Sequence, residues 1–316
     1  MKIQSDAGLA QVCELLEAGC PGRAKPLVED ALAQDLENEQ IQFALRCVNF
    51  WIDKIPVSPE IDGDGKFEAA EELTRQWKQF ISFAGKVADE SEWIMRAVCR
   101  GVFSTALECY ELALHTQHSS QQSDICRRLG LCYKKLGQYE TALAHLSEAN
   151  TLTPDQPEIL AEMADCYALC GNDRTAKVLF REAFFTGDPK IDIGFLDSEM
   201  IRRLIELVES RGYTGQALLE WIPVYGVLYG VFTVKRELRA HEAGKLKQAI
   251  FSLENELKES GADRQVMVPR LINHYFWFID HLIARQEERS KIEETLLRIK
   301  VLDGEVHKKY TGIKPD

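Results

Sequence analysis

The amino-acid sequence predicts an all-α protein built from stacked helical hairpins, and three observations support this fold class. Apolar residues recur at spacings of three and four along most of the chain. A segment of 34 residues, 123–156, is followed by a second segment with the same order of small and apolar positions. Glycines separate the predicted helices at places where a left-handed residue would end a helix. Because two helices cannot bury their apolar faces alone, we expect these units to stack on one another.

The best-defined unit is SDICRRLGLCYKKLGQYETALAHLSEANTLTPDQ, which predicts two amphipathic helices joined at Gly137. Small and apolar side chains form one face of each helix, and Pro154 stops the second helix. These facing residues are Cys126, Leu129, Gly130 and Tyr133 in the first helix and Ala142, Leu146 and Ala149 in the second. The pattern restarts at Pro157 with a turn at Gly171. Two consecutive copies indicate a repeat architecture.

The residues before this pair predict two divergent units. The first spans 5–38 and has its turn at Gly19. The second begins with a helix at 39–54, is interrupted by an acidic loop at 55–65, and resumes as a helix at 67–87. This loop is the main departure from the repeat.

Three further units and a cap complete the predicted chain. The third unit turns at Gly101, the sixth at Gly212 and the seventh at Gly244. Longer helices at 266–286 and 290–310 lack the small residues of the repeat, so we expect them to cover the end of the stack. The predicted division is therefore 1–86 (divergent hairpins with the acidic loop), 87–190 (best-matching units), 191–263 (divergent units) and 264–316 (C-terminal capping helices).

The pattern of the central unit resembles the tetratricopeptide repeat (TPR), whose consensus is W-x2-L-G-x2-Y, then A-x3-F, then P. Cys126 stands where the family prefers Trp, and Leu146 where it prefers Phe. The matching residues are Leu129, Gly130, Tyr133, Ala142 and Pro154. The resemblance implies a right-handed superhelical solenoid of about seven or eight antiparallel hairpins with a capping helix pair. It also implies a scaffold or adaptor that holds a peptide or a partner's helix in a concave groove.

Helical spacing places a set of charged and apolar residues toward that groove. The set is Arg127, Leu131, Lys134, Lys135, Asp165, Leu169, Arg202 and Glu206. Two interpretations remain open for its basic members. They engage carboxylates of an acidic peptide or chain terminus, or they pair with Glu158, Glu162 and Asp165 of the neighbouring unit. A regulator that senses a peptide or small ligand is an alternative to the scaffold.

The acidic loop and the helix after it carry the spacing of a twelve-residue calcium loop. The candidate ligand positions are Glu60, Asp62, Asp64, Lys66 and Glu71, with Gly65 at the sixth position. Glu60 replaces the usual Asp, and Pro56 and Pro59 keep an entering helix away from the loop. The alternative is a polar turn that caps the helix starting at Phe67. A calcium-responsive adaptor is therefore a further alternative, and we expect no other cofactor.

Composition limits the function classes further. Residues 1–95 hold 18 acidic and 9 basic residues, a net charge of −9 within −12 for the chain, which argues against nucleic-acid binding. The most apolar stretch, Ile222–Val234, has 13 residues and is too short to cross a membrane. With no apolar leader at the first residues and nine cysteines, we expect a cytoplasmic protein with free thiols. His274 and His281 share a helical face and are expected to be core or surface residues.

We therefore expect a protein that is not an enzyme. No glycine-rich phosphate loop, nucleophile elbow or paired-carboxylate motif occurs in the sequence. The expected partner is a protein or peptide, and a homo-oligomer is compatible with the pattern.

Overall fold

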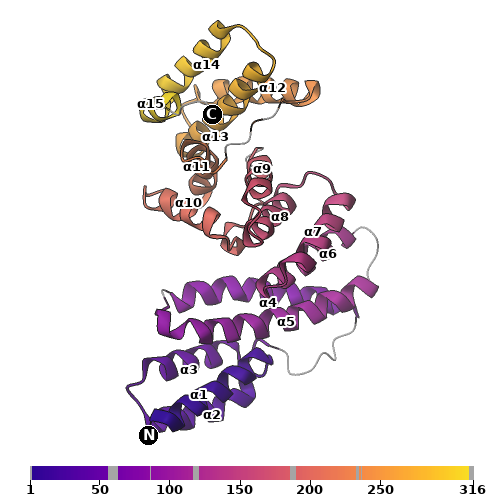
Figure 1. Cartoon of the computed structure of the whole chain (residues 1–316), viewed down its shortest axis with the longest axis vertical. Coiled ribbons are helices and arrows are strands. Elements are labelled where there is room, and N and C mark those ends of the chain that lie inside the picture. The colour runs from indigo at the N-terminus through magenta and orange to yellow at the C-terminus, as the bar shows by residue number, and fades with distance from the viewer. Residues whose placement is uncertain are drawn as a thin grey trace. The chain divides into compact units, whose positions relative to one another are not determined.

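Every regular element that the structure describes is a helix (Figure 1). The computed structural model describes residues 2–55, 63–85, 87–116, 121–185, 190–232, 235 and 237–312. The predicted all-α class is confirmed for these residues.

The chain forms two compact units, 1–154 and 155–316. The first unit contains α1 (Lys2–Glu17), α2 (Pro21–Gln34), α3 (Glu39–Trp51), α4 (Gly63–Ala84), the 3-10 helix η1 (Asp89–Ser91), α5 (Glu92–Thr116), α6 (Gln122–Lys135) and α7 (Tyr139–Leu152). The second contains α8 (Pro157–Leu169), α9 (Asp173–Ala183), η3 (Ile193–Phe195), α10 (Glu199–Glu209), α11 (Gly215–Leu228), α12 (Ala240–Glu256), α13 (Arg264–Ala284), α14 (Arg289–Leu302) and α15 (Gly304–Gly312). The boundary falls inside 87–190, which the repeat pattern groups together.

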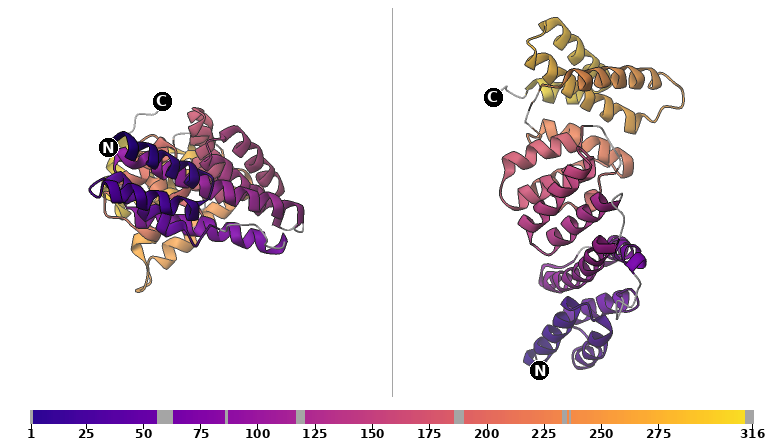
Figure 2. Two further views of the ribbon diagram at one scale, coloured as in Figure 1. Left: turned by 90° about the horizontal axis from the view of Figure 1, so that it is seen from below. Right: turned by 90° about the vertical axis from the view of Figure 1, so that its right-hand side faces the viewer.

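Helices that follow one another in sequence pack as pairs within each unit, as the two further views in Figure 2 also show. The pairs are α1 with α2, α4 with α5, α6 with α7, α8 with α9, and α10 with α11. Gly137 and Gly171 have φ angles of +80° and +78° at the turns of the two central pairs. Both predicted turns are confirmed, as are those at Gly19 and Gly212.

The seam of the α6–α7 pair depends on the absence of a side chain at Gly130. A Cβ atom there would lie 2.6 Å from Cγ of Leu146 and 3.3 Å from the carbonyl oxygen of Ala142. Cys126 and Leu129 are buried on the same side of α6. The two helices can therefore approach closely, as the repeat pattern predicted.

The predicted turn at Gly101 is wrong, because α5 runs through this residue without a break. A Cβ atom at Gly101 would lie 1.9 Å from the carbonyl oxygen of Leu16 at the end of α1. This glycine therefore permits a close contact between the backbones of α1 and α5. A glycine in a helical pattern can mark either a turn or a close approach, and the spacing alone does not distinguish them.

The predicted turn at Gly244 is also wrong. Gly244 lies in the first half of α12, and a Cβ atom there would meet no atom within 4 Å. The helix begins at Ala240, before the predicted turn, and the Glu242 side chain accepts a hydrogen bond from the backbone N–H of Arg239 at 2.7 Å. Leu238, expected in a preceding helix, is buried in a non-helical segment, and Val234 lies outside the described residues.

The C-terminal segment that was predicted to form a cap contains three helices rather than two. The segment 266–286 corresponds to α13, but 290–310 is divided into α14 and α15 at Asp303. One carboxylate oxygen of Asp303 accepts hydrogen bonds from the backbone N–H groups of Glu305 and Val306, both at 2.9 Å. Because these N–H groups belong to the first turn of α15, Asp303 starts a new helix there.

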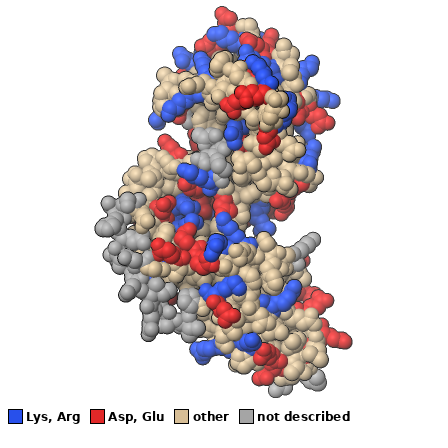
Figure 3. All heavy atoms as spheres, turned by 180° about the vertical axis from the view of Figure 1, so that it is seen from behind, with Lys and Arg blue, Asp and Glu red and all other residues tan. Residues whose placement is uncertain are grey.

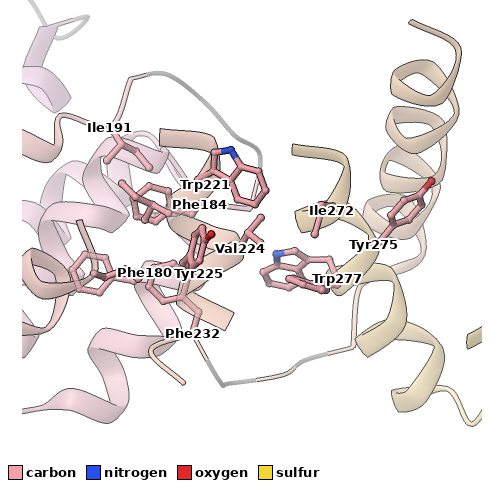
Figure 4. Packing of buried hydrophobic residues seen from close by; sticks show 14 of the residues in the cluster. Phe180, Phe184, Ile191, Trp221, Val224, Tyr225, Phe232, Ile272, Tyr275 and Trp277 are labelled. Carbon is pink, nitrogen blue, oxygen red and sulfur yellow. The ribbon is translucent and has the colours of Figure 1, made fainter. Parts of the chain in front are cut away.

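Helix α13 is the centre of the second unit, with α11, α12 and α14 packed against it. Phe232 lies between Phe180 and Phe184, with ring centroids 6.2 and 5.7 Å away (Figure 4). Trp277 of α13 contacts Phe185, with ring centroids 4.4 Å apart. Tyr275, Phe276 and Trp277 are therefore part of the core.

None of the nine cysteines forms a disulfide bond, and six of them are buried. Burial raises the pKa of Cys13 and of Cys47 to about 12, so these thiols are protonated at neutral pH and serve as small core side chains. None of the described helices has the length and apolar character needed for a membrane crossing.

We predict opposite effects for alanine at the two glycines that do not form turns. Gly101→Ala forces α1 and α5 apart and should lower the free energy of unfolding by about 2 kcal/mol or more. Gly244→Ala adds no clash and should raise it by about 0.5–1 kcal/mol, because alanine loses less backbone entropy. Urea unfolding followed by circular dichroism measures both changes. A neutral Gly101→Ala would contradict the close approach.

His274 predicts a pH dependence of the second unit's stability. Burial, with a smaller contribution from Arg270, lowers its pKa to about 4, and its Nδ1 atom has no hydrogen-bond partner among the described residues. The unfolded chain takes up a proton near pH 6.5 and the folded chain only near pH 4, so stability is lost as the pH falls between these values. The loss from pH 7 to 5 should be about 2 kcal/mol.

The free energy of unfolding of His274→Gln, measured with urea at pH 7 and at pH 5, should lack the loss of stability that His274 causes. The exposed His241→Gln is the matched control and should retain it. An unchanged pH dependence in His274→Gln would contradict the assignment.

Candidate functional site

The candidate site consists of the residues that the sequence placed on the first helices of successive pairs. Four of them lie on α6 in the first unit: Arg127, Leu131, Lys134 and Lys135. Arg127 and Lys135 are half-buried, whereas Leu131 and Lys134 are 0% and 2% exposed. Of these four residues, the basic ones that are partly exposed are therefore Arg127 and Lys135.

The other four residues lie in the second unit, on α8 and α10. Leu169 is half-buried near the end of α8, and Asp165 is completely buried one turn earlier. Arg202 and Glu206 are both exposed and lie four residues apart on α10, so they share one face of that helix. The opposite face of α10 is anchored by buried Ile201, Leu204 and Val208.

Asp165 connects the two elements of the site in this unit. Its carboxylate oxygens accept hydrogen bonds from the backbone N–H groups of Asp197 and Ser198, each at 2.8 Å. Ser198 is the residue immediately before α10. Hydrogen bonds to a carboxylate are stronger than neutral ones, and this buried carboxylate receives two. Asp165 therefore orients α10, and with it Arg202 and Glu206, relative to α8.

The residues proposed for calcium lie partly outside the described residues. Glu60, Asp62 and the side chain of Asp64 lie outside the described part of the chain. Lys66 and Glu71 lie on α4, which begins at Gly63. Calcium binding stays an untested hypothesis.

Glu71 is engaged with two other helices. Tyr110 of α5 donates a hydrogen bond to its Oε1 atom at 2.6 Å, and Arg128 of α6 pairs with its Oε2 atom at the same distance. This contact joins α4, α5 and α6. The sequence analysis missed the role of Arg128, because only the pairing of distant helices reveals its partner.

A second buried charge cluster was also missed. Arg181 of α9 forms an ion pair with Asp280 of α13, and both side chains are less than 5% exposed. The guanidinium also donates to the carbonyl oxygen of Phe232 at 3.3 Å and lies 4.6 Å from the ring centre of Trp277. Lys235 is 3.5 Å from the other oxygen of Asp280. The cluster joins α9, α13 and the segment between α11 and α12. Burial alone would disfavour the charges of Arg181 and Asp280, and their pairing offsets this cost.

The accessible part of the site offers polar recognition. Arg202 can donate paired hydrogen bonds to a carboxylate, and Glu206 can accept from a lysine, an arginine or a backbone N–H group. On the face drawn in Figure 3, basic and acidic side chains lie interspersed. In the part of the chain that the structure describes, no group of three or more His, Cys, Asp or Glu residues could hold a metal ion.

We predict that Asp165→Asn lowers the free energy of unfolding by about 2 kcal/mol, because an uncharged amide cannot make two charge-assisted hydrogen bonds. Hydrogen exchange of the α10 backbone amides should also become faster. Asp173→Asn, on the exposed first turn of α9, is the matched control and should change stability by less than about 0.5 kcal/mol. Equal effects of the two substitutions would contradict an orienting role for Asp165.

No model of a known protein family and no curated protein sequence matches this chain. The described fold, helices packed in consecutive pairs, is compatible with a helical repeat protein. The resemblance to the tetratricopeptide repeat therefore rests on the residues of the two segments 123–156 and 157–190 themselves. The site is accordingly defined by its own geometry and charge.

Proposed function

We propose that the protein is a non-catalytic, TPR-like scaffold or adaptor that binds a peptide segment or a helix of a partner protein. In this proposal, the recognition surface is formed by the first helices of successive pairs, and the protein acts in the cytoplasm without a cofactor. The observation that carries the proposal is that the two faces of α10 have different roles. One face is buried by Ile201, Leu204 and Val208, while Arg202 and Glu206 stay exposed on a helix that Asp165 holds in place.

A rigid support makes exposed charges useful for recognition. An arginine on a mobile segment loses side-chain and backbone entropy when it binds, whereas one on a fixed helix loses only side-chain entropy. Arg202 is exposed and Arg127 is half-buried, and each lies on a packed helix. Carboxylates are their natural ligands, because the planar guanidinium matches the two carboxylate oxygens. An acidic or mixed-charge peptide is therefore the expected partner.

Selection from a random peptide library with the full-length chain, followed by fluorescence anisotropy, tests this proposal. Selected peptides should contain Asp or Glu, and Arg127→Glu and Arg202→Glu should each weaken binding by about tenfold, which corresponds to one lost charge-assisted contact. Unchanged affinity in both variants would contradict the proposal.

Arg264→Glu is the matched control, since Arg264 is exposed at the start of α13 and lies outside the candidate site. It should change the affinity by less than about twofold. Equal weakening by all three charge reversals would show that net charge alone attracts the peptides, and the proposed surface would be wrong.

A further inference from the structure

Two turns at one end of the first unit expose large apolar side chains. Leu36 lies in the turn between α2 and α3 and is 68% exposed. Trp93 lies in the first turn of α5 and is 39% exposed. Figure 1 shows the start of α3 and the start of α5 at the same end of this unit. An exposed tryptophan is a side chain that protein interfaces use often, because it combines a large apolar area with few rotatable bonds.

Hydrogen bonds hold the two turns together. The side-chain amide of Gln40 donates to the carbonyl oxygen of Glu90 at 2.9 Å, and that of Gln42 donates to the carbonyl oxygen of Leu36 at 2.7 Å. Asn38 caps the start of α3 by accepting from two backbone N–H groups. These contacts position both apolar side chains without help from a partner.

Carboxylates flank the two apolar residues in the sequence. The segments 32–40 and 88–95 contain six acidic residues and no Lys or Arg: Asp35, Glu37, Glu39, Asp89, Glu90 and Glu92. Glu92 pairs with Arg96 at 3.3 Å, but both side chains are more than half exposed, so this pair is weak. Within the described residues, Glu37, Glu39, Asp89 and Glu90 form no ion pair. The surface therefore combines an apolar centre with unneutralised negative charge.

We propose that this surface, the acidic–apolar patch, docks a basic amphipathic segment of a partner protein. Apolar side chains of the segment would cover Leu36 and Trp93, and its Lys or Arg residues would neutralise the surrounding carboxylates. A second copy of this chain is a poor occupant, because it carries a net charge of −12 and would add to the repulsion. The patch thus differs from the α6 and α10 surface both in location and in the charge of its partner.

Anisotropy measurements on the full-length chain with a designed probe test this inference. The probe is a fluorescein-labelled amphipathic peptide of about four helical turns, with Lys on one face and Leu on the other, and its counterpart has Glu in place of Lys. Only the Lys peptide should bind. Leu36→Ser with Trp93→Ser, and separately Glu37→Lys with Glu90→Lys, should each weaken it by about tenfold.

Two control variants make the same changes on exposed residues of the second unit. Leu297→Ser with Phe251→Ser matches the apolar variant, and Glu259→Lys with Glu293→Lys matches the charge variant. Both should change the affinity by less than about twofold. If the two charge variants weaken binding equally, the attraction is a property of the whole acidic chain, and the inference is wrong. Unchanged binding by the apolar variant, or equal binding of the Glu peptide, would overturn it as well.

Carbodiimide cross-linking of the Lys peptide to the unmodified chain gives an independent readout if a patch variant fails to fold. Cross-links should concentrate on Glu37, Glu39, Asp89 and Glu90, whereas cross-links spread over both units would contradict the patch. These probes and variants differ from those for the acidic-peptide surface, so either surface can fail without the other.

Discussion

Close approach of helix backbones at small residues is the constraint on which this fold depends. At Gly130 and Gly101 there is no room for even a Cβ atom, because Leu146 and the backbone of Leu16 occupy that space. A hairpin has too little apolar surface to be stable alone, so its helices must pack at short distance and then cover a neighbouring helix. Larger residues such as Trp51 and Phe180 are accommodated elsewhere, fully buried between helices. The glycines thus determine which helix faces become interior.

Buried charges add orientation to this packing. The carboxylates of Asp165 and Asp280 each contact groups on another helix or on the segment before a helix. An unpaired buried carboxylate is strongly unfavourable, so each contact discriminates against arrangements that separate its partners. Apolar packing alone tolerates small rotations and shifts, because it has no directional preference. Hydrogen-bonded charges therefore fix the helix orientations that the exposed residues of α10 rely on.

The two proposed surfaces have one physical feature in common. In each, a helix or turn held by contacts with neighbouring elements presents exposed or half-exposed charged or apolar side chains. Helices α6 and α10 each offer a guanidinium group, and the acidic–apolar patch offers carboxylates near Leu36 and Trp93. A chain with surfaces of opposite charge can bring together two partners that would not compete for one site. This is a property that an adaptor requires and that a single binding groove does not provide.

The sequence by itself determined the all-α class, the helix pairs around Gly137 and Gly171, and the turns at Gly19 and Gly212. These features depend on local periodicity and on backbone conformations that few residues adopt. Tertiary structure decided that Gly101 and Gly244 lie inside helices, that Asp303 divides the C-terminal cap, and that Leu131, Lys134 and Asp165 are buried. Partners such as Arg128 for Glu71 and Asp280 for Arg181 also appeared only in the folded chain. Helical spacing defines the face of a helix on which a residue lies, but burial and pairing depend on which other helix covers that face.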